Sequence, residues 1–591
     1  MQRSEVKEQY KWAIEDIYPT DEAWEKDYDR ALSSLNFSRY AGKLGDKKEL
    51  LSFLKANDEF MKLAEALAVY AYMKHDEDAR ISKYTSYNSK VGMLFARYSA
   101  EVAFYEPEMA SQSEEYLNSL IADKNFSDYD YQLKQLVKRK PHVLSEGEEK
   151  LIALAGETFS TFKETFGMID NADLPLPEIE LDGKKVKLSH GLYGLVLHSS
   201  DREKRKEVYE KYYGAYLSLI NTITSTYYGN VKKDVFYSKA YKFNSCLERA
   251  LFEEDVDRAV YDNLLASVKK SFPAMHRYIA DRKRILDYDK LYFYDIYAPL
   301  VADVDFKMTY DEAYDYVIKG LAPLGKEYQA LLKRGHDERW IDVEETEGKR
   351  SGAYSTGVTG VHPFVLLNYQ PTLSDVFTIA HEMGHSLHTY FSSSNQPYAK
   401  SDYRIFVAEV ASTVNEVLLL KFMLKEAQDD NLKKYLLNYY LDTIRATLHR
   451  QTLFAEFEFK AHDLVEKGEP LTKENLCKMY ADLNKRYYGD AIEHDYNISC
   501  EWCRIPHFYT AFYVYKYSTG IITAMNIANR ILTEGESAVK DYFAFLSGGS
   551  STDPVSLLKL AGVDLTTSAP FEFAMAEFDN TLREFEKLMG L

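Results

Sequence analysis

Two histidines separated by three residues could hold a metal ion between them. The segment HEMGH places His381 and His385 four positions apart, with Glu382 directly after the first. On a helix, side chains at i and i+4 project side by side, so both imidazoles can bind one ion, and zinc takes such ligands at about 2.0–2.1 Å. Glu382 would face the rim of that site, where a carboxylate can accept a proton from metal-bound water. The spacing therefore predicts a metal site that activates water.

A catalytic zinc ion needs a third protein ligand, with the fourth position left to water. One class of proteins with the H-E-x-x-H motif requires a glycine and a further histidine just downstream. This chain has His388 and Phe391 at those two positions, which excludes that class. The other common solution is a glutamate on a following helix, and Glu409 stands 24 residues after His385. We predict that Glu409 is the third ligand and that one Zn²⁺ binds per chain.

Two helices must bring these ligands together, and the sequence predicts both of them. In the first, apolar residues recur every three or four positions and form one buried face. These residues are Val376, Ala380, Met383, Leu387 and Phe391. Pro371 and the capping pair Thr372 and Asp375 mark the start of this helix. The second helix covers 405–420, where a polar stripe interrupts an apolar segment. The stripe consists of Glu409, Ser412, Thr413 and Glu416.

A carboxylate within an apolar helix is costly to bury unless it is paired or bound to metal, which favours Glu409 as a ligand. Glu416 is a candidate to orient a ligand imidazole by accepting a hydrogen bond from it. His388 lies seven residues after His381. It is either a further residue of this orienting kind or a histidine of the core, and the sequence leaves both interpretations open.

The composition is that of a globular protein, and the charge restricts its partners. The chain has 591 residues, of which 46% are hydrophobic and 28% charged. Its net charge of −19 argues against binding to nucleic acids or anionic lipids, because both require a basic face. Four cysteines are too few for a disulfide framework, and the chain contains neither an apolar signal segment nor a run approaching 18 apolar residues. We expect a cytoplasmic protein without membrane or nucleic-acid partners.

Glycine and proline are scarce, at 27 and 15 residues, so long helices are expected along most of the chain. The predicted regions are 1–112, an N-terminal helical region, 113–198, a helical segment ending in a small β-hairpin, and 199–591, the catalytic domain. The hairpin turns at Asp182 and Gly183, with an irregular surface loop as the alternative. A second break at 348–371 predicts a strand near 361–369, which Pro363 places at a sheet edge or at the start of the strand.

The two helices carry a family resemblance. HEMGHSLH followed by FVAEVASTVNE resembles the thimet oligopeptidase and oligoendopeptidase F family of zinc peptidases. Other segments resemble the oligoendopeptidase F branch: GKRSGAYS (348–355), LERALFEEDVDRAVYDNLL (247–265), DYDKLYFYDIY (287–297) and RIPHFYTAFYVYKYSTG (504–520). The resemblance covers most of the chain, most strongly 200–580. It implies a mainly α, two-lobed body with a deep substrate channel, a small β-sheet next to the H-E-x-x-H helix, and cytosolic cleavage of short peptides.

The resemblance also implies roles for individual residues. It assigns His381, His385 and Glu409 as ligands and Glu382 as the catalytic base, and it suggests substrate-binding roles for His507 and nearby tyrosines. One departure is the pair Cys500 and Cys503, a C-x-x-C spacing that is not typical of the family. A redox pair would be one interpretation, and incidental thiols are the interpretation we prefer.

Attack on a peptide bond creates an oxyanion, which needs a hydrogen-bond donor besides zinc. Four tyrosines close together can supply one: Tyr509, Tyr513, Tyr515 and Tyr517. We expect His507, Tyr515 and Tyr509 to be catalytic and Tyr513 to bind substrate, although packing in a half-buried helix would also explain the cluster. Pro506 leaves the phase of the following helix undefined, so the tyrosine that faces zinc stays open.

The strand near 361–369 suggests how substrate is held. An extended peptide could add to a free edge of this strand through main-chain hydrogen bonds, which would make residue preference broad. Gly352, Ala353 and Tyr354, in the loop before it, are the candidate substrate-binding residues. The alternative is a structural hairpin that only covers the catalytic helix.

We therefore expect a zinc endopeptidase that cleaves internal bonds of short oligopeptides. A zinc carboxypeptidase or dipeptidyl carboxypeptidase is the alternative, because those families share the helical fold, the H-E-x-x-H motif and a downstream glutamate. A helical binding protein without activity is the third possibility, and it requires a site that lacks metal or water. The oligomeric state is left open by the sequence.

Overall fold

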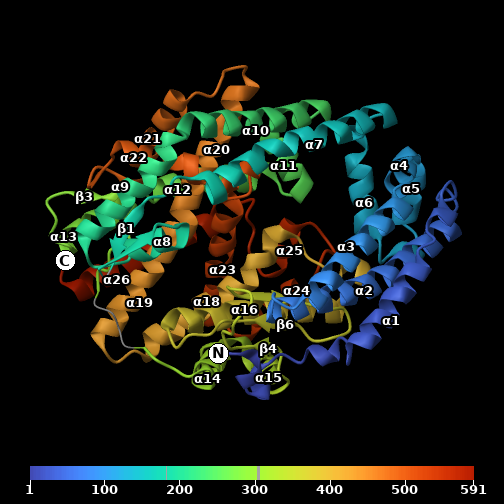
Figure 1. Cartoon of the computed structure of the whole chain (residues 1–591), viewed down its shortest axis with the longest axis horizontal. Helices are drawn as coiled ribbons and strands as arrows, with labels where there is room; N and C mark the ends of the chain where they lie inside the picture. The colour runs from blue at the N-terminus through green and yellow to red at the C-terminus, as the bar shows by residue number, and fades with distance from the viewer. Residues whose placement is uncertain (182, 302–305) are drawn as a thin grey trace. The chain divides into compact units, whose positions relative to one another are not determined.

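The computed structural model describes residues 1–181, 183–301 and 306–591. Over this part of the chain the fold is mainly helical, and its short strands form small sheets of two or three strands (Figure 1). This confirms the predicted mainly α class with a small sheet. Among the helices so described, none combines the length and the apolar character that crossing a membrane would require.

Packing divides the chain into two compact units, each assembled from separate stretches of sequence. Unit 1 comprises Met1–Val143, Phe306–Phe422 and Ile527–Val563. Unit 2 comprises Leu144–Asp305, Met423–Asn526 and Asp564–Leu591. The three regions predicted from the sequence follow chain order instead, and that division stays a proposal.

Unit 1 contains the N-terminal helices, the segment with HEMGH and its small sheet. Its helices are α1 (Asp21–Ser34), α2 (Lys47–Glu77), α3 (Ser82–Val102), α4 (Tyr105–Ser111), α5 (Glu114–Ile121), α6 (Asp130–Arg139), α14 (Tyr310–Gly320), α15 (Gly325–Asp337), α16 (Leu373–Asn395), α17 (Tyr398–Ser401), most of α18 (Ile405–Glu426), α24 (Glu536–Leu546) and α25 (Pro554–Leu560). Its strands are β4 (Ile341–Asp342), β5 (Tyr354–Thr356) and β6 (Phe364–Leu366).

Unit 2 is helical apart from two pairs of short strands. Its helices are α7 (Glu146–Met168), α8 (His190–Leu197), α9 (Arg202–Ser218), α10 (Ile220–Ala240), α11 (Cys246–Glu254), α12 (Arg258–Lys270), α13 (Phe272–Ile285), α19 (Asp430–Ile444), α20 (Arg450–Glu466), α21 (Lys473–Tyr488), α22 (Tyr496–Ser499), the first part of α23 (Tyr515–Glu534), and α26 (Ala569–Met589). Its strands are β1 (Glu178–Leu181), β2 (Lys184–Lys187), β3 (Leu291–Tyr292) and β7 (Ile492–Glu493).

Strands β1 and β2 form the hairpin that the sequence predicted. They pair antiparallel, with Ile179 opposite Val186. Gly183 has a φ of +73°, a left-handed conformation that a side chain would disfavour, and this explains its place in the turn. Asp182, the other predicted turn residue, lies outside the described residues.

The sheet of unit 1 has the strand order β4-β6-β5, so β6 is its central strand. The main-chain N–H groups of Val365 and Leu367 donate toward β4, at 2.9 Å to the Trp340 oxygen and 2.8 Å to the Asp342 oxygen. Since strand residues alternate in direction, the groups of β6 between them face β5. The prediction that this strand lies at a sheet edge was wrong. Its alternative, that the strand begins after Pro363, is confirmed because β6 starts at Phe364.

The free edge of the sheet belongs to β5 instead. Ser355 is paired opposite Val365, whose main-chain groups face β4. The N–H and C=O of Ser355 therefore point to the outer side of β5. The sheet therefore has a free strand edge, but this edge lies on β5 and not on β6, where the sequence analysis predicted that a peptide could add.

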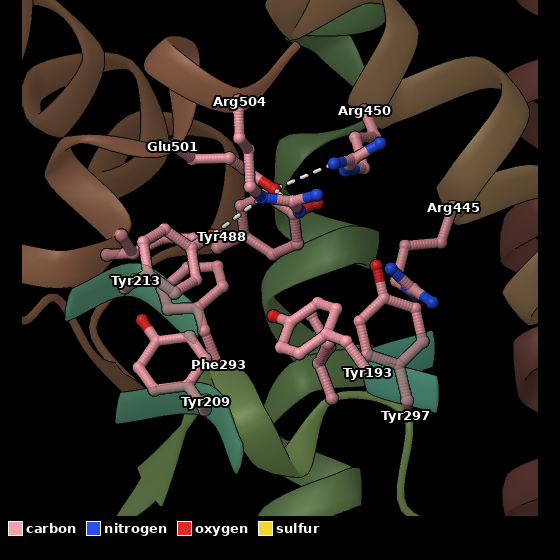
Figure 2. A pocket seen from close by; sticks show the side chains of 12 residues that line it. Tyr193, Tyr209, Tyr213, Phe293, Tyr297, Arg445, Arg450, Tyr488, Glu501 and Arg504 are labelled. Atoms are coloured by element: carbon pink, nitrogen blue, oxygen red, sulfur yellow. Dashed lines mark hydrogen bonds and ion pairs between the residues drawn. The ribbon is translucent and has the colours of Figure 1, made fainter. Parts of the chain in front are cut away.

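Buried arginines tie the segments of unit 2 together (Figure 2). Arg450 on α20 donates to Glu501 at 2.7 Å, and Arg504 donates to the same carboxylate oxygen at 2.5 Å. Tyr480 on α21 donates to the other oxygen of Glu501. Burial alone would raise the pKa of Glu501, but the two arginines hold it at about 2. Glu501 is therefore a permanent anion whose hydrogen-bonding capacity is used within the fold.

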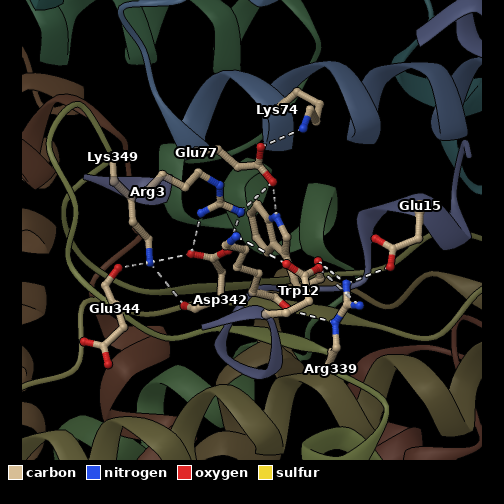
Figure 3. Close-up of polar contacts among 11 residues, drawn as sticks. Arg3, Trp12, Glu15, Lys74, Glu77, Arg339, Asp342, Glu344 and Lys349 are labelled. Atoms are coloured by element: carbon tan, nitrogen blue, oxygen red, sulfur yellow. Dashed lines mark hydrogen bonds and ion pairs between the residues drawn. The ribbon is translucent and has the colours of Figure 1, made fainter. Parts of the chain in front are cut away.

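A second buried charge network anchors the N-terminus to the sheet of unit 1 (Figure 3). Arg3 donates two hydrogen bonds to Asp342 on β4, at 3.1 and 2.7 Å, and a third to Glu77 at 2.7 Å. Lys349 lies 2.7 Å from the same Asp342 carboxylate, and Trp12 donates to Glu77 at 2.7 Å. A buried carboxylate is tolerated only when it is paired, and Asp342 has two cations. This network fixes the outer strand β4 and so the position of β6.

Candidate metal centre

Helix α16 forms as its sequence predicted. The hydroxyl of Thr372 accepts a hydrogen bond from the Asp375 N–H at 3.3 Å, which is the predicted cap. The predicted apolar face is buried along its whole length, from Val376 through Phe391. Burial of that face turns His381 and His385 to another side of the helix, toward α18.

A glycine inside the motif sets the distance between the two helices. A Cβ atom on Gly384 would lie 2.5 Å from Cα of Ser412 and 2.7 Å from the Ala411 oxygen, both backbone atoms of α18. The Asn415 amide donates to the Ala380 oxygen at 2.9 Å, and Tyr328 donates to Asn415 at 2.9 Å. Close approach and these bonds fix the register of α18 against α16.

Three donor atoms converge where the helices meet. His381 Nε2 lies 3.2 Å from His385 Nε2, and the Oε2 atom of Glu409 lies 3.5 and 3.4 Å from these two nitrogens. Ligands at about 2.0–2.1 Å in a tetrahedron stand about 3.3 Å from each other, so this triangle has the size of one face around zinc. Two imidazoles and a carboxylate are also a ligand set that zinc accepts. The residues present therefore fit the ion that the motif implies.

Two further residues hold the ligands in place. The Nδ1 atom of His381 contacts Glu416 Oε1, the arrangement in which a carboxylate fixes the tautomer of a ligand imidazole. Ser412 donates to Glu409 Oε2 at 3.3 Å. The contact expected between Glu416 and a ligand imidazole is present. The sequence analysis noted Ser412 only as part of the polar stripe and missed its contact with Glu409.

The electrostatics of the site suit a doubly charged cation. Burial opposes protonation of His381, yet the contact with Glu416 and the neighbouring carboxylates raise the pKa of this imidazole to about 9. The hydrogen bond with His385 lowers the pKa of Glu409 to about 2. The shift of His381 reflects the negative charge of the carboxylates around it, and that of Glu409 reflects the imidazoles beside it, so the carboxylates favour a cation at this place.

Glu382 stands apart from the ligands in its environment. Its side chain is buried, whereas Glu409 is about half exposed. Burial raises the pKa of Glu382, with smaller contributions from Glu409 and Glu416. A carboxylate with a raised pKa next to two imidazoles is suited to exchange a proton near neutral pH.

His388 belongs to the core. The ring is completely buried and stacks on Tyr403, with ring centres 3.7 Å apart. Neither ring nitrogen has a hydrogen-bond partner within the described part of the chain, and burial lowers its pKa to about 3. Of the two interpretations left open by the sequence, the core histidine describes this residue, and the orienting role fails because no ligand is bonded to it.

Gly352 and Ala353 lie beside the start of α16. Both are exposed, and they line a surface cavity of about 280 Å³ together with Asp375 and Thr378, which is one turn before His381. Tyr354 differs from them, because its hydroxyl donates to Asp76 at 3.0 Å and its ring packs near Trp12. The polar end of its side chain is used within the fold, and a role of Tyr354 in substrate binding stays a prediction.

The residues proposed to assist catalysis lie in unit 2, and two of them are part of its core. Tyr509 is 4% exposed, donates or accepts a hydrogen bond at 2.8 Å with Thr226, and stacks on Phe166. Tyr515 is 1% exposed and packs edge-on against Tyr261. Burial favours packing for these two phenols, the alternative that the sequence had left open, and their catalytic roles stay a prediction.

Three other aromatic residues form an accessible cluster in unit 2. The rings of His507 and Tyr513 are 6.0 Å apart, and those of Tyr513 and Tyr517 are 5.4 Å apart. His507 is exposed, and both tyrosines are half-buried. Tyr517, which was not among the predicted site residues, lies in the first turn of α23, whereas Tyr513 precedes that helix, so the sequence spacing gave no helical signal for this pair.

The cysteines pair differently from their sequence spacing. All four are buried free thiols. Cys500 lies 3.2 Å, sulfur to sulfur, from Cys477 on α21, and Trp502 donates to Cys477 at 3.4 Å. The close contact is therefore between Cys500 and Cys477, and the C-x-x-C spacing to Cys503 did not identify it.

Replacing Gly384 by alanine is expected to weaken metal binding by at least about 10-fold and to cost about 1–3 kcal/mol of stability, because the new methyl group forces α18 away from α16. Zinc titration and chemical denaturation of the variant measure both effects. Gly92 on α3 offers a matched control, since a Cβ there meets nothing within 4 Å. Gly92→Ala should stabilise the protein by up to about 1 kcal/mol and leave zinc binding unchanged. Unchanged zinc affinity in Gly384→Ala would contradict the close-packing argument.

Comparison with known proteins gives consistent results over the whole chain. Residues 195–577 match the sequence profile of Peptidase family M3, and residues 108–175 match a profile described as Oligopeptidase F. The chain is 44% identical to oligopeptidase PepF of Bacillus subtilis, over 99% of this chain and 88% of that protein.

Solved structures agree with this result. A crystal structure from Chlamydophila abortus is 36% identical, covers 99% of both chains and superimposes with a TM-score of 0.93. The structure of oligoendopeptidase-F from Enterococcus faecium is 34% identical, covers 96% of this chain and 99% of that one, and gives a TM-score of 0.75.

Proposed function

The chain belongs to peptidase family M3 and is a peptide-bond hydrolase, and we propose that it is a zinc endopeptidase that cleaves internal bonds of short oligopeptides. The observation that carries the proposal is the triangle of His381, His385 and Glu409 donor atoms, which has the size of a face of a zinc tetrahedron. The proposed setting is the cytoplasm, with short peptides as substrates and no nucleic-acid or membrane partner.

His381, His385 and Glu409 would hold the ion, and Glu416 would keep the His381 ring in the ligand tautomer. A bound zinc ion would lower the pKa of its water to about 7 and polarise the substrate carbonyl. Glu382 then takes the proton from the attacking water and delivers it to the leaving amine. Its buried position and raised pKa support this role, because such a carboxylate both accepts and releases a proton readily.

Substrate would bind in an extended conformation along β5. The outward N–H and C=O of Ser355 can form main-chain hydrogen bonds with one residue of the peptide. Gly352 and Ala353 continue that edge beside the cavity at the start of α16. Binding through main-chain groups depends little on the side chains of the peptide, so the proposed enzyme tolerates varied sequences around the cleaved bond.

The proposal keeps His507 as a hydrogen-bond donor and Tyr513 as a substrate-binding residue, and it moves the catalytic tyrosine to Tyr517. His507, Tyr513 and Tyr517 are accessible, whereas Tyr509 and Tyr515 are not. An oxyanion donor must reach the substrate, so accessibility decides between the tyrosines.

Tyr517→Phe is expected to lower kcat by about 100-fold with a much smaller change in KM, because an oxyanion contact strengthens late in the reaction. Tyr515→Phe is the matched control, since its ring is buried, and its kcat should stay within about threefold of the wild type. Steady-state kinetics with one peptide measures both. A larger loss of kcat in Tyr515→Phe than in Tyr517→Phe would identify Tyr515 as the oxyanion donor.

A peptide blocked at both ends, with a fluorophore and quencher flanking its middle, tests the function itself. The proposed endopeptidase cleaves it, whereas a carboxypeptidase or dipeptidyl carboxypeptidase requires a free C-terminus and leaves it intact. Cleavage should stop when a chelator removes the metal and resume when zinc is restored. Turnover that persists without metal would exclude the proposed mechanism, and a protein that never cleaves the peptide would favour the alternatives.

A further inference from the structure

Unit 2 contains a pocket whose lining is rich in arginine and tyrosine (Figure 2). The space inside it that is open to a water-sized particle is about 20 Å³, which is room for one water molecule or one compact ion. Arg445, directly after the end of α19, contributes a positive charge to the lining, as do Arg450 and Arg504, and Glu501 contributes the one negative charge. The pocket thus carries a positive excess in a space too small for a peptide of several residues.

The carboxylates that reach these arginines do not cancel this excess. Glu501 is shared by Arg450 and Arg504. Asp442 is shared by Arg445, at 2.9 Å, and Arg282, at 3.4 Å. Two carboxylates therefore pair with four guanidinium groups. Buried charge without a counter-charge is costly, so this excess of positive charge favours a bound anion.

Hydrogen-bond donors without a partner point to the same conclusion. Arg445 is 2% exposed, and its Nη1 atom is buried with no acceptor within the described residues. Its guanidinium lies over the ring of Tyr297, 5.1 Å from the ring centre, as Figure 2 shows. Tyr297 and Tyr488 also line the pocket, and each carries a phenol hydroxyl. These groups can all donate a hydrogen bond, and an anion is the ligand that accepts several.

The arginines of the pocket also act on the phenol of Tyr297. Burial raises the pKa of a phenol, but Arg450 and Arg445 together bring the pKa of Tyr297 below its ordinary value. The positive potential at this hydroxyl therefore outweighs the penalty for placing a negative charge in the protein interior.

We propose that this pocket of unit 2 binds a small inorganic anion, held by Arg445 and the hydroxyls of Tyr297 and Tyr488. The cation–anion pairing supplies the missing counter-charge, and the tyrosine hydroxyls supply directional hydrogen bonds. The proposed zinc ligands belong to unit 1 and the pocket residues to unit 2, and anion binding can be tested without zinc.

Bromide is the first probe, because it is a compact monoanion with an anomalous X-ray signal. Crystals of the full-length protein grown with sodium bromide should show one anomalous peak next to Arg445 and Tyr297. In solution, melting temperature is measured against chloride or bromide at constant ionic strength, with sodium methanesulfonate as the balancing salt. A saturable rise of about 2 °C is expected at 100 times the Kd. Phosphate and acetate, tested in parallel, distinguish a compact halide site from one for oxyanions or carboxylates.

Variants assign the effect to the pocket. Arg445→Gln should abolish the saturable rise, and Tyr297→Phe, which keeps the ring, should weaken the Kd by about 10-fold. Arg583→Gln is the matched control, because this arginine of unit 2 is 64% exposed and pairs with Asp579. It should retain the full response. If Arg445→Gln does not fold, Tyr297→Phe and the bromide peak still decide. No peak in the pocket, a peak without a saturable response in solution, or an equal response in Tyr297→Phe would each overturn the proposal.

Discussion

Glu382→Gln is expected to lower kcat by about 10²–10⁴-fold while the protein keeps its zinc. Glutamine has the size of glutamate but cannot accept a proton from water at neutral pH. The ligand atoms belong to His381, His385 and Glu409, and none of them is changed by this substitution. Elemental analysis for zinc and kcat with the doubly blocked peptide measure the two outcomes on the same sample.

A second glutamate of unit 1 provides the control. Glu338 is 46% exposed and pairs with Arg334 at the surface. Glu338→Gln should leave both zinc content and kcat unchanged. This result would exclude that the loss of any one negative charge lowers activity. If Glu382→Gln retains substantial turnover, another group is the base. If it loses zinc, the lost activity no longer identifies the role of Glu382, and the assignment of ligands must be revised.

The candidate metal centre was predictable because its signals are local or periodic. His381 and His385 share a helical side by their spacing, and Glu409 was visible as a carboxylate in an otherwise apolar helix. The cap at Thr372 and the buried face of α16 followed from the same kind of pattern, as did the hairpin of β1 and β2.

The errors arose where a partner distant in sequence decides the outcome. Strand β4 has only two residues, Ile341 and Asp342, too few for a periodic signal, so the central place of β6 could not be seen. The direction of each tyrosine could not be predicted, because α23 begins at Tyr515 after an irregular turn. Gly384 was part of the motif, but its contact with the backbone of α18 exists only in three dimensions.

Glu409→Ala is expected to lower zinc affinity by more than 100-fold, the second large effect. Residues that only orient a ligand typically change metal affinity by about 10–100-fold, and a ligand must exceed this range. Glu416→Gln therefore shows how much zinc affinity is lost when only an orienting residue is changed. The carboxylate of Glu416 contacts the Nδ1 atom of His381 and acts on zinc only through that ring. Competition with a chelator of known affinity gives the dissociation constant of each variant.

Helix α18 itself supplies the control for this series. Glu426 is exposed in its last turn, so Glu426→Ala removes the same charge without approaching the histidines. Its zinc affinity should equal that of the wild type. A larger loss in Glu416→Gln than in Glu409→Ala would exchange the two roles, and unchanged zinc content in Glu409→Ala would refute its place as a ligand. Because the distances from Glu409 Oε2 to the two Nε2 atoms are nearly equal, at 3.5 and 3.4 Å, its carboxylate completes the triangle, and its loss leaves only two protein ligands.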